Sequence, residues 1–171
     1  MECERIFVAC DVSNLFRSCR DVYGDSARVD FQILSAMIPA MEYPRTVNQK
    51  LMAYIVTDPK QRHHGFSNAL CSYGFNVRER FMSREKAGDQ LTRTDWDVGI
   101  TIDAIDNIDN YDTFALVSGD GDFSILLDYM KVREKKTLVL SFEKCTARSL
   151  YAAADKHVML TQSILFNSAL K

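Results

Sequence analysis

Continuously apolar runs alternate along the chain with stretches whose apolar residues recur at helical spacing. Ile6–Cys10 and Phe114–Val117 are short, uninterrupted apolar runs, which are typical of strands buried on both faces. Glycine, proline and polar clusters separate such runs from the helical stretches. The predicted strands cover residues 6–10, 50–56, 76–82, 113–118, 137–142 and 157–160. The predicted helices cover residues 14–23, 30–40, 62–72, 95–108, 122–133, 146–154 and 163–170.

The order of these elements predicts the fold class. Strands that alternate with helices indicate an α/β fold, doubly wound, with a mostly parallel central sheet of five to six strands and helices on both faces. A length of 171 residues suits a single domain spanning residues 1–171. In such sheets, ligands bind at the C-terminal ends of the strands, near the point where the strand order reverses.

The helix predicted over residues 95–108 has a clear apolar stripe. Its apolar side contains Val98, Ile102 and Ile105, extended by Thr101, Ala104 and Ile108. A stripe of this kind normally packs against the core. Thr94 or Asp95 is expected to cap the start of the helix.

Composition and the chain ends narrow the class of protein. No apolar run approaches the roughly 18 residues that a membrane-spanning helix needs. The start, Met1–Arg5, lacks the basic and apolar segments of a signal peptide, so a cytoplasmic location is expected. The five cysteines include no CxxC pair and therefore do not indicate a structural zinc site.

The formal net charge is only −2, but the charges are unevenly distributed. Residues 95–112 contain six aspartates and no lysine or arginine, whereas residues 78–93 contain five basic residues. Two interpretations remain open. The pair of segments is either a metal centre beside a phosphate-binding rim or simply two solvated surfaces of opposite sign.

Aspartates directly follow two of the predicted buried strands. Asp11 ends the first strand, and Asp120 and Asp122 follow the strand at residues 113–118. We expect Gly121, between the last two, to allow a tight turn that brings both carboxylates to one ion. Asp97 lies in the first turn of the middle helix, where the helix N-terminus stabilises negative charge. Carboxylates gathered in this way favour Mg²⁺ or Mn²⁺, which prefer oxygen ligands and activate water.

Each of these residues also has a purely structural interpretation. Asp11 or Asn14 would cap the following helix, and Asp120 with Asp122 would form a turn and cap the helix after Phe123. Asp103 points about 120° away from Asp97 on an ideal helix. We therefore expect Asp103 to orient neighbouring groups rather than to share an ion with Asp97.

At these residues the sequence resembles the NYN branch of the PIN-like nuclease superfamily, in particular its LabA-like group. The shared marks are Asp11-x-x-Asn14, Asp97-Val98 with Asp103-Ala104, Ser118-Gly119-Asp120-Gly121-Asp122-Phe123, and the segment Leu150–Asp155. The glycine-rich motif is the most specific, and together the marks span nearly the whole chain. The chain departs from the family pattern at Val12, where Gly or Ala is more common, and at Asp95-Trp96, where Lys and Gly are common.

The resemblance implies a ribonuclease fold with an acidic pocket for Mg²⁺ or Mn²⁺. Asp11, Asp97, Asp120 and Asp122 are then both the catalytic residues and the metal ligands. Asn14, Asp103 and Ser118 are the auxiliary residues of this predicted site.

RNA would be held mainly through its phosphates. The loops after the second and third strands lie on the same edge as Asp11 if the sheet is parallel. The basic residues that we expect there are Lys60, Arg62, Arg84, Lys86 and Arg93. Trp96 either stacks on a base or packs in the core, and His63 and His64 are either functional or merely solvated. The cluster at residues 131–136 precedes the fifth strand, so it is expected at the opposite edge.

The leading hypothesis is a metal-dependent endonuclease that hydrolyses phosphodiester bonds, with RNA the favoured substrate. One alternative is a weak or inactive RNA-binding or protein-interaction module on the same fold. Another is a small-molecule phosphohydrolase, although Ser13 stands where the haloacid-dehalogenase signature needs a second aspartate. No GxGxxG follows the first strand, which argues against dinucleotide binding. A homodimer remains an open alternative for the assembly.

Overall fold

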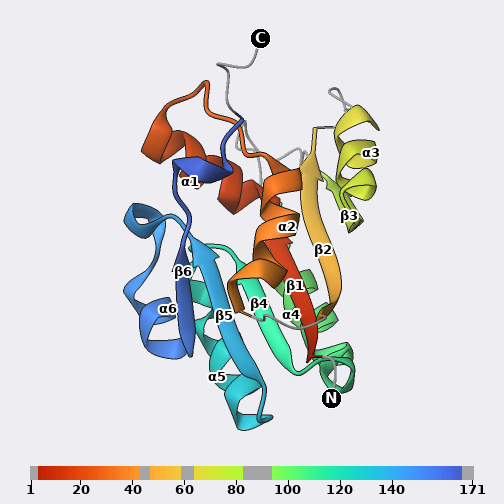
Figure 1. Ribbon diagram of the computed structural model, residues 1–171, viewed down its shortest axis with the longest axis vertical. Coiled ribbons are helices and arrows are strands. Elements are labelled where there is room, and N and C mark those ends of the chain that lie inside the picture. The colour runs from red at the N-terminus through yellow and green to blue at the C-terminus, as the bar shows by residue number, and fades with distance from the viewer. Residues whose placement is uncertain (1–3, 43–46, 59–63, 83–93, 167–171) are drawn as a thin grey trace, which may run out of the picture.

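The computed structural model describes residues 4–42, 47–58, 64–82 and 94–166, and its centre is a six-stranded parallel sheet (Figure 1). The strands are β1 (Glu4–Asp11), β2 (Val47–Thr57), β3 (Phe75–Phe81), β4 (Thr113–Val117), β5 (Lys136–Ser141) and β6 (Lys156–Met159). Their order is β3-β2-β1-β4-β5-β6, and every neighbouring pair is parallel. The predicted fold class is therefore confirmed.

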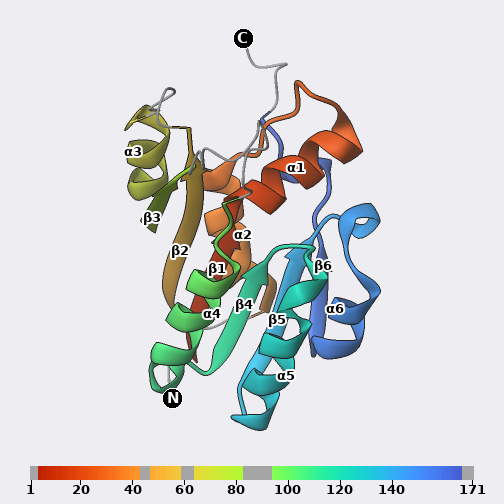
Figure 2. The same cartoon turned by 180° about the vertical axis from the view of Figure 1, so that it is seen from behind.

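Helices cover both faces of the sheet and divide the core into two layers. The helices on one face are α1 (Val12–Tyr23), α2 (Phe31–Glu42) and α3 (His64–Ser72), seen in front in Figure 1. The helices on the other face are α4 (Asp97–Asp106), α5 (Ser124–Val132) and α6 (Arg148–Ala153), seen in front in Figure 2. Alternate residues of the central strands supply the two cores, as the continuous apolar runs predict.

The largest error of the sequence-based prediction concerns the orientation of α4. Val98, Ile102 and Ile105 are 69%, 52% and 36% exposed, so the central residues of the predicted apolar stripe face solvent, whereas Ala104 and Ile108, which extend it, are buried. The buried side of α4 instead carries Ile100, Asp103 and Ala104. Asp103 on this side has polar partners on the sheet, Tyr54 and Arg78. A search for apolar residues at helical spacing does not detect a buried side that carries an aspartate.

The ends of several predicted helices also differ. The N-cap of α4 is Trp96, with no side-chain cap, so the capping prediction for Thr94 or Asp95 was wrong. The helix predicted over residues 122–133 begins as a 3-10 turn, Gly121–Phe123, before α5. The prediction of a terminal helix was also wrong for residues 163–166, the part of it that the structure describes. It is a 3-10 turn, Gln162–Ile164, capped by the side chain of Thr161, and Leu165 then pairs with Val29.

The strand order reverses between β1 and β4, and this position defines the candidate site. The chain leaves β1 into α1 on one face and leaves β4 toward α5 on the other. Neighbouring parallel strands whose helices diverge in this way leave a crevice at their C-terminal ends. In the described ranges, no helix is both long and apolar enough to cross a membrane.

Candidate acidic active site

A hollow of about 690 Å³ lies at the C-terminal edge of the sheet, where β1 and β4 end. Its lining includes five carboxylates, which define the acidic pocket: Asp11, Asp95, Asp97, Asp120 and Asp122. The structure thus brings the four predicted acids to one pocket. The fifth, Asp95, was not among the predicted site residues, because its expected role was to cap the following helix.

Asp11 ends β1 and is only 7% exposed. Its Oδ1 accepts a hydrogen bond from the backbone N–H of Asn14 at 3.0 Å, so it also caps α1. Burial raises the pKa of Asp11, and the charge of Asp120 raises it further, whereas the Asn14 N–H and the charge of Arg17 lower it. The capping interpretation and the placement of Asp11 in the pocket therefore both hold.

Asn14 connects the two sides of the crevice. Its Oδ1 accepts hydrogen bonds from the backbone N–H of Gly119 at 3.0 Å and from Ser18 Oγ at 3.4 Å. The buried Ser118 acts on the same turn, because its Oγ accepts the backbone N–H of Asp120 at 3.2 Å. These two predicted auxiliary residues thus hold the turn after β4 in place.

The turn that carries Asp120 and Asp122 needs its glycines for a reason other than the one expected. Neither Gly119 nor Gly121 has a positive φ. A Cβ at Gly119 would instead overlap the carbonyl oxygen of Cys145, and one at Gly121 would lie 2.9 Å from Ala147 Cβ. Close packing against the segment before α6 therefore demands glycine. Within the turn, Asp120 Oδ1 accepts the backbone N–H of Asp122 at 3.2 Å.

Trp96 anchors the start of α4, which carries Asp97. Its Nε1 donates to the carbonyl oxygen of Ile55 at 2.8 Å, and its ring meets that of Tyr54 edge-on at 5.4 Å. A Cβ at Gly99 would overlap the Trp96 ring, so glycine at this position lets the ring pack closely against the helix. Of the two interpretations of Trp96, the structure shows packing.

Asp97 has the most strongly perturbed carboxylate in the pocket. Partial burial is the largest cause that raises its pKa to about 6, and the charges of Asp95, Asp11, Asp120 and Asp122 each raise it further. Like charges that shift a pKa in this way show that the carboxylates act on one another across the pocket. Such a concentration of negative charge attracts a cation.

Asp103 points away from the pocket, into the layer between α4 and the sheet. Its Oδ1 accepts from Arg78 Nη2 at 2.8 Å, and its Oδ2 accepts from the hydroxyl of Tyr54 at 2.9 Å. Burial and the Asp103 charge raise the pKa of Tyr54, so this hydroxyl stays a donor. Tyr54 pairs with Asp11 in the sheet register, so this network fixes α4 directly beside the site. Asp103 thus orients its neighbours and does not line the acidic pocket, as expected.

The acidic pocket contains the type of donor atom that a metal ion needs, but it does not present a complete coordination shell. Within the described ranges, no group of three or more His, Cys, Asp or Glu side chains is arranged to hold an ion. The five carboxylates line the hollow, but no three of them are close enough together to hold one ion. They are hard oxygen donors of the kind that Mg²⁺ and Mn²⁺ prefer.

Two arginines of α1, Arg17 and Arg20, also line the acidic pocket. Neither arginine was predicted as a site residue from the sequence. Their signal is helical spacing, because Ser13, Arg17 and Arg20 lie on one face of the helix that starts at Asp11. The five predicted RNA-binding residues all lie outside the described residues: Lys60, Arg62, Arg84, Lys86 and Arg93.

The model of the family described as the NYN domain matches residues 5–161. The chain belongs to the NYN domain family. It is 33% identical over 107 residues to the low amplitude and bright protein LabA of Synechococcus elongatus, an alignment that covers 60% of this chain and 57% of LabA. It also resembles a crystal structure of a protein of unknown function from Vibrio parahaemolyticus, with 31% identity and a TM-score of 0.80. That match covers 96% of this chain and 99% of the other.

Membership of the NYN family, within the PIN-like nuclease superfamily, makes this a nuclease-type domain. The motif Ser118–Phe123, which carries the resemblance most specifically, supplies two of the five acids of the pocket. The segment Leu150–Asp155 has a structural place in this NYN domain. Asp155 Oδ2 accepts from both the backbone N–H and the hydroxyl of Thr137, at 2.8 and 2.9 Å, and so joins the segment between α6 and β6 to β5.

Proposed function

We propose that this NYN domain is a metal-dependent endonuclease that hydrolyses phosphodiester bonds of RNA. The observation that supports the proposal most directly is the acidic pocket at the strand-order reversal, where burial and then four other carboxylates raise the pKa of Asp97. In open α/β sheets this is the position where ligands bind. The NYN family favours RNA as the nucleic acid.

Asp11 and Asp120 are the central residues of the proposed site. They follow neighbouring strands, and the charge of one already shifts the pKa of the other. Asp97 and Asp122 approach from α4 and from the turn after β4. Together these four would hold Mg²⁺ or Mn²⁺, which, when bound, lowers the pKa of water and offsets charge on the scissile phosphate.

The remaining polar groups of the pocket suit the substrate. Arg17 and Arg20 project from α1 into the same hollow and are exposed, so they are placed to contact backbone phosphates. Asn14 and Ser118 keep the turn that carries Asp120 against α1 and therefore act as positioning residues.

The test is a cleavage panel of single-stranded RNA, structured RNA and DNA, each incubated with Mg²⁺, with Mn²⁺ and with EDTA. We expect metal-dependent cleavage of RNA that Asp120→Asn abolishes, while RNA binding and the thermal midpoint are retained. Asp128→Asn is the matched control, because Asp128 is an exposed aspartate of α5 whose contact is with Lys131. Calorimetric titration with Mn²⁺ should show binding to the wild type and to Asp128→Asn, and weaker binding to Asp120→Asn.

A second candidate, an RNA-binding module without catalysis, is favoured by one specific observation. The described carboxylates do not form a preassembled ion site. If the wild type binds RNA but cleaves none of the panel with either metal, the endonuclease proposal is wrong and the binding module is the better description.

A further inference from the structure

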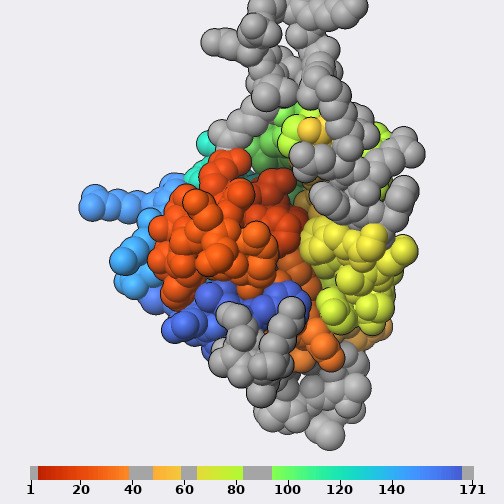
Figure 3. All heavy atoms as spheres, turned by 90° about the horizontal axis from the view of Figure 1, so that it is seen from above, coloured from red at the N-terminus to blue at the C-terminus, as the bar shows by residue number. Residues whose placement is uncertain are grey.

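A second hollow, of about 620 Å³, lies beside the acidic pocket. It is bounded by α1, residues 27–28, the C-terminal end of β2 and the start of α3. Seen from above, α1 (red to orange) and α3 (yellow) lie side by side (Figure 3), and residues of both line the hollow. The residues that line both hollows are Ser13, Phe16, Arg20, Val56 and Met82. The two hollows therefore form one continuous groove along the C-terminal edge of the sheet.

Seven of the thirteen described residues that line this second hollow, called the apolar hollow below, are aromatic or aliphatic. Phe16 and Phe66 contact each other with ring centroids 5.6 Å apart, and each also packs edge-on against Phe31, at 5.7 and 5.6 Å. Both rings are half-buried, so each is held by the core and still has a surface that faces the hollow. The volume falls within the roughly 300–1,000 Å³ that is typical of pockets for small organic groups.

Two guanidinium groups lie at the apolar hollow. Arg20 is in the last turn of α1 and is common to both hollows. Arg28 Nη1 donates to the carbonyl oxygens of Asp25 and Ala27, at 2.6 and 2.8 Å, and these bonds position its side chain. Guanidinium groups bind phosphate through planar, paired N–H donors. Aromatic surfaces beside such cations are the combination with which proteins hold unstacked nucleotides.

We propose that the apolar hollow binds one unpaired nucleobase of the RNA strand whose scissile phosphate lies in the acidic pocket, an inference that rests on the proposed endonuclease function. The base stacks on Phe16 and Phe66, and its flanking phosphates lie near Arg20 and Arg28. A base inside a duplex is covered by its neighbours on both sides and cannot enter a hollow between two helices. The substrate class is therefore single-stranded or locally unpaired RNA.

The test measures binding separately from cleavage. Fluorescence anisotropy with Ca²⁺ in place of Mg²⁺ or Mn²⁺ compares a short labelled single-stranded RNA, the same strand with one abasic nucleotide at each position in turn, and its duplex. Ser67→Trp fills the hollow from the first turn of α3. Asn68→Trp is the matched control, because it adds the same side chain at the next, exposed position, which does not line the hollow.

We expect Ser67→Trp to weaken binding of the intact strand about tenfold, as the loss of one stacked base should, and Asn68→Trp to leave it unchanged. One abasic position should weaken wild-type binding by a similar factor and have no further effect in Ser67→Trp, because both changes remove the same contact. Any of three results would overturn the proposal. Ser67→Trp would bind the intact strand as tightly as the wild type does, or an abasic nucleotide would still weaken binding to Ser67→Trp. The third is equal binding of the duplex and the single strand by the wild type.

Two controls keep these outcomes separate from folding and from catalysis. If Ser67→Trp lowers the thermal midpoint strongly, Phe66→Leu replaces it, since it removes the ring and keeps an apolar side chain. If Ser67→Trp weakens RNA binding but the wild type cleaves no RNA in Mn²⁺, only the endonuclease proposal is overturned. If the wild type cleaves RNA but Ser67→Trp binds RNA as tightly as the wild type does, only the proposal of a nucleobase site is overturned. Equal displacement of RNA by an apolar dye and by nucleoside monophosphate would show that the hollow takes apolar ligands in general and would also overturn it.

Discussion

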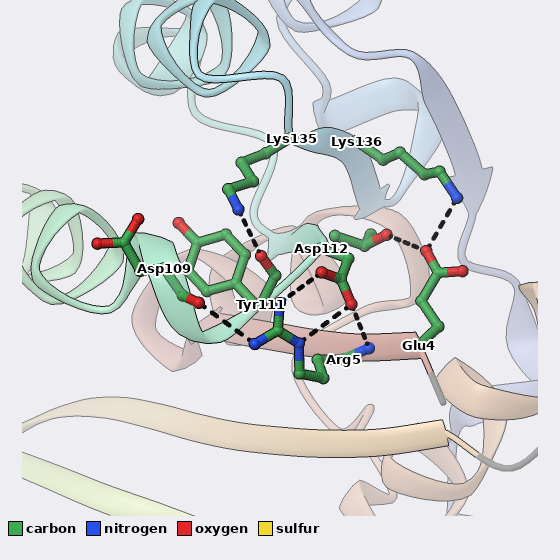
Figure 4. Close-up of polar contacts among 8 residues, drawn as sticks. Glu4, Arg5, Asp109, Tyr111, Asp112, Lys135 and Lys136 are labelled. Atoms are coloured by element: carbon green, nitrogen blue, oxygen red, sulfur yellow. Dashed lines mark hydrogen bonds and ion pairs between the residues drawn. The ribbon is translucent and has the colours of Figure 1, made fainter. Parts of the chain in front are cut away.

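The two edges of the same parallel sheet use their charged residues in opposite ways. At the N-terminal edge, Asp112 pairs with Arg5 at 2.6 Å and Glu4 pairs with Lys136 at 3.0 Å (Figure 4). At the C-terminal edge, five aspartates line one pocket, and the structure gives none of them an ion pair with another described residue. The ion pairs at the N-terminal edge connect strands of the sheet to one another. At the C-terminal edge, carboxylates of like charge lie close together, and their repulsion costs free energy of folding.

The pKa values express this contrast. The hydrogen bond from the Arg5 side chain is the largest cause that holds the pKa of Asp112 below its usual value. Burial, followed by four neighbouring carboxylates, raises the pKa of Asp97 to about 6. The same residue type thus stabilises the folded state at one edge and destabilises it at the other, which is expected where charge is kept for binding rather than for stability. Lys135, which donates to the carbonyl oxygen of Tyr111, also lies at the paired edge, where the 131–136 cluster was predicted.

The largest expected effect concerns the turn that carries two of the acids. Gly119→Ala should lower the free energy of unfolding by about 3 kcal/mol, because the new Cβ overlaps the Cys145 carbonyl oxygen, which belongs to the backbone. Urea denaturation of Gly119→Ala and of Gly65→Ala measures this. Gly65 is the control in α3, where a Cβ has no neighbour within 4 Å. Equal stability of the two variants would contradict the close packing of this turn.

The next effect concerns activity. Asp97→Asn should reduce metal-dependent RNA cleavage by about 100-fold or more, because a proposed metal ligand should matter at least as much as a residue that only supports the ligands, whose loss costs roughly 10–100-fold. Asp112→Asn, at the paired edge, should leave the rate constant unchanged. Single-turnover cleavage assays at saturating protein check both variants. A comparable loss in the two would mean that the acidic pocket has no special role.

A smaller effect is expected at the paired edge. Asp112→Asn should lower the free energy of unfolding by about 0.5–1 kcal/mol, since the carboxylate and Arg5 are both partly exposed and the solvent screens them. Chemical denaturation at low and at high salt tests this prediction. The difference from the wild type should shrink as salt rises, and a constant difference would show that the lost contact is not electrostatic.

The smallest effect is a stability difference with opposite pH dependence at the two edges. The folded-state pKa of Asp97 lies above its unfolded value of about 3.9, so its contribution to stability is fully present below that value and is lost as the pH rises through about 6. Without metal, Asp97→Asn should therefore raise the thermal midpoint on the order of 2 °C near neutral pH, a modest figure because the carboxylate is only partly buried.

At the paired edge the sign is reversed. The pKa of Asp112 is lowered on folding, so its contribution is present above its unfolded pKa and is lost as the pH falls through the folded value. Melting curves of Asp97→Asn, Asp112→Asn and the wild type across the acidic range test both signs. If both variants shift the midpoint in the same direction at neutral pH, the contrast between the edges is wrong.

Much of the fold and part of the candidate site followed from local features of the sequence. Continuous apolar runs such as Phe114–Val117 predicted buried parallel strands, and the aspartates directly after two of them were placed at one edge. This inference succeeds because every strand of a parallel sheet ends at the same edge. The residue that follows a strand is therefore located as soon as the strand is recognised.

Tertiary structure alone decided which side of α4 faces the sheet. The apolar stripe of Val98, Ile102 and Ile105 is exposed because Tyr54 and Arg78, on two distant strands, hold Asp103 in the interior. These partners are 49 and 25 residues away along the chain, so no local periodicity reveals them.

The same distinction holds for the site. The sequence by itself determined that Asp11, Asp97, Asp120 and Asp122 are candidates for one metal site. Only the folded chain added Asp95, Arg17 and Arg20, and only packing against Cys145 explained Gly119. The pattern of residues along the chain predicts at which edge of the sheet a residue lies, because this depends only on the strand or helix to which the residue belongs. Neighbours across a pocket are set by how separate elements pack, which depends on contacts between residues far apart in the sequence.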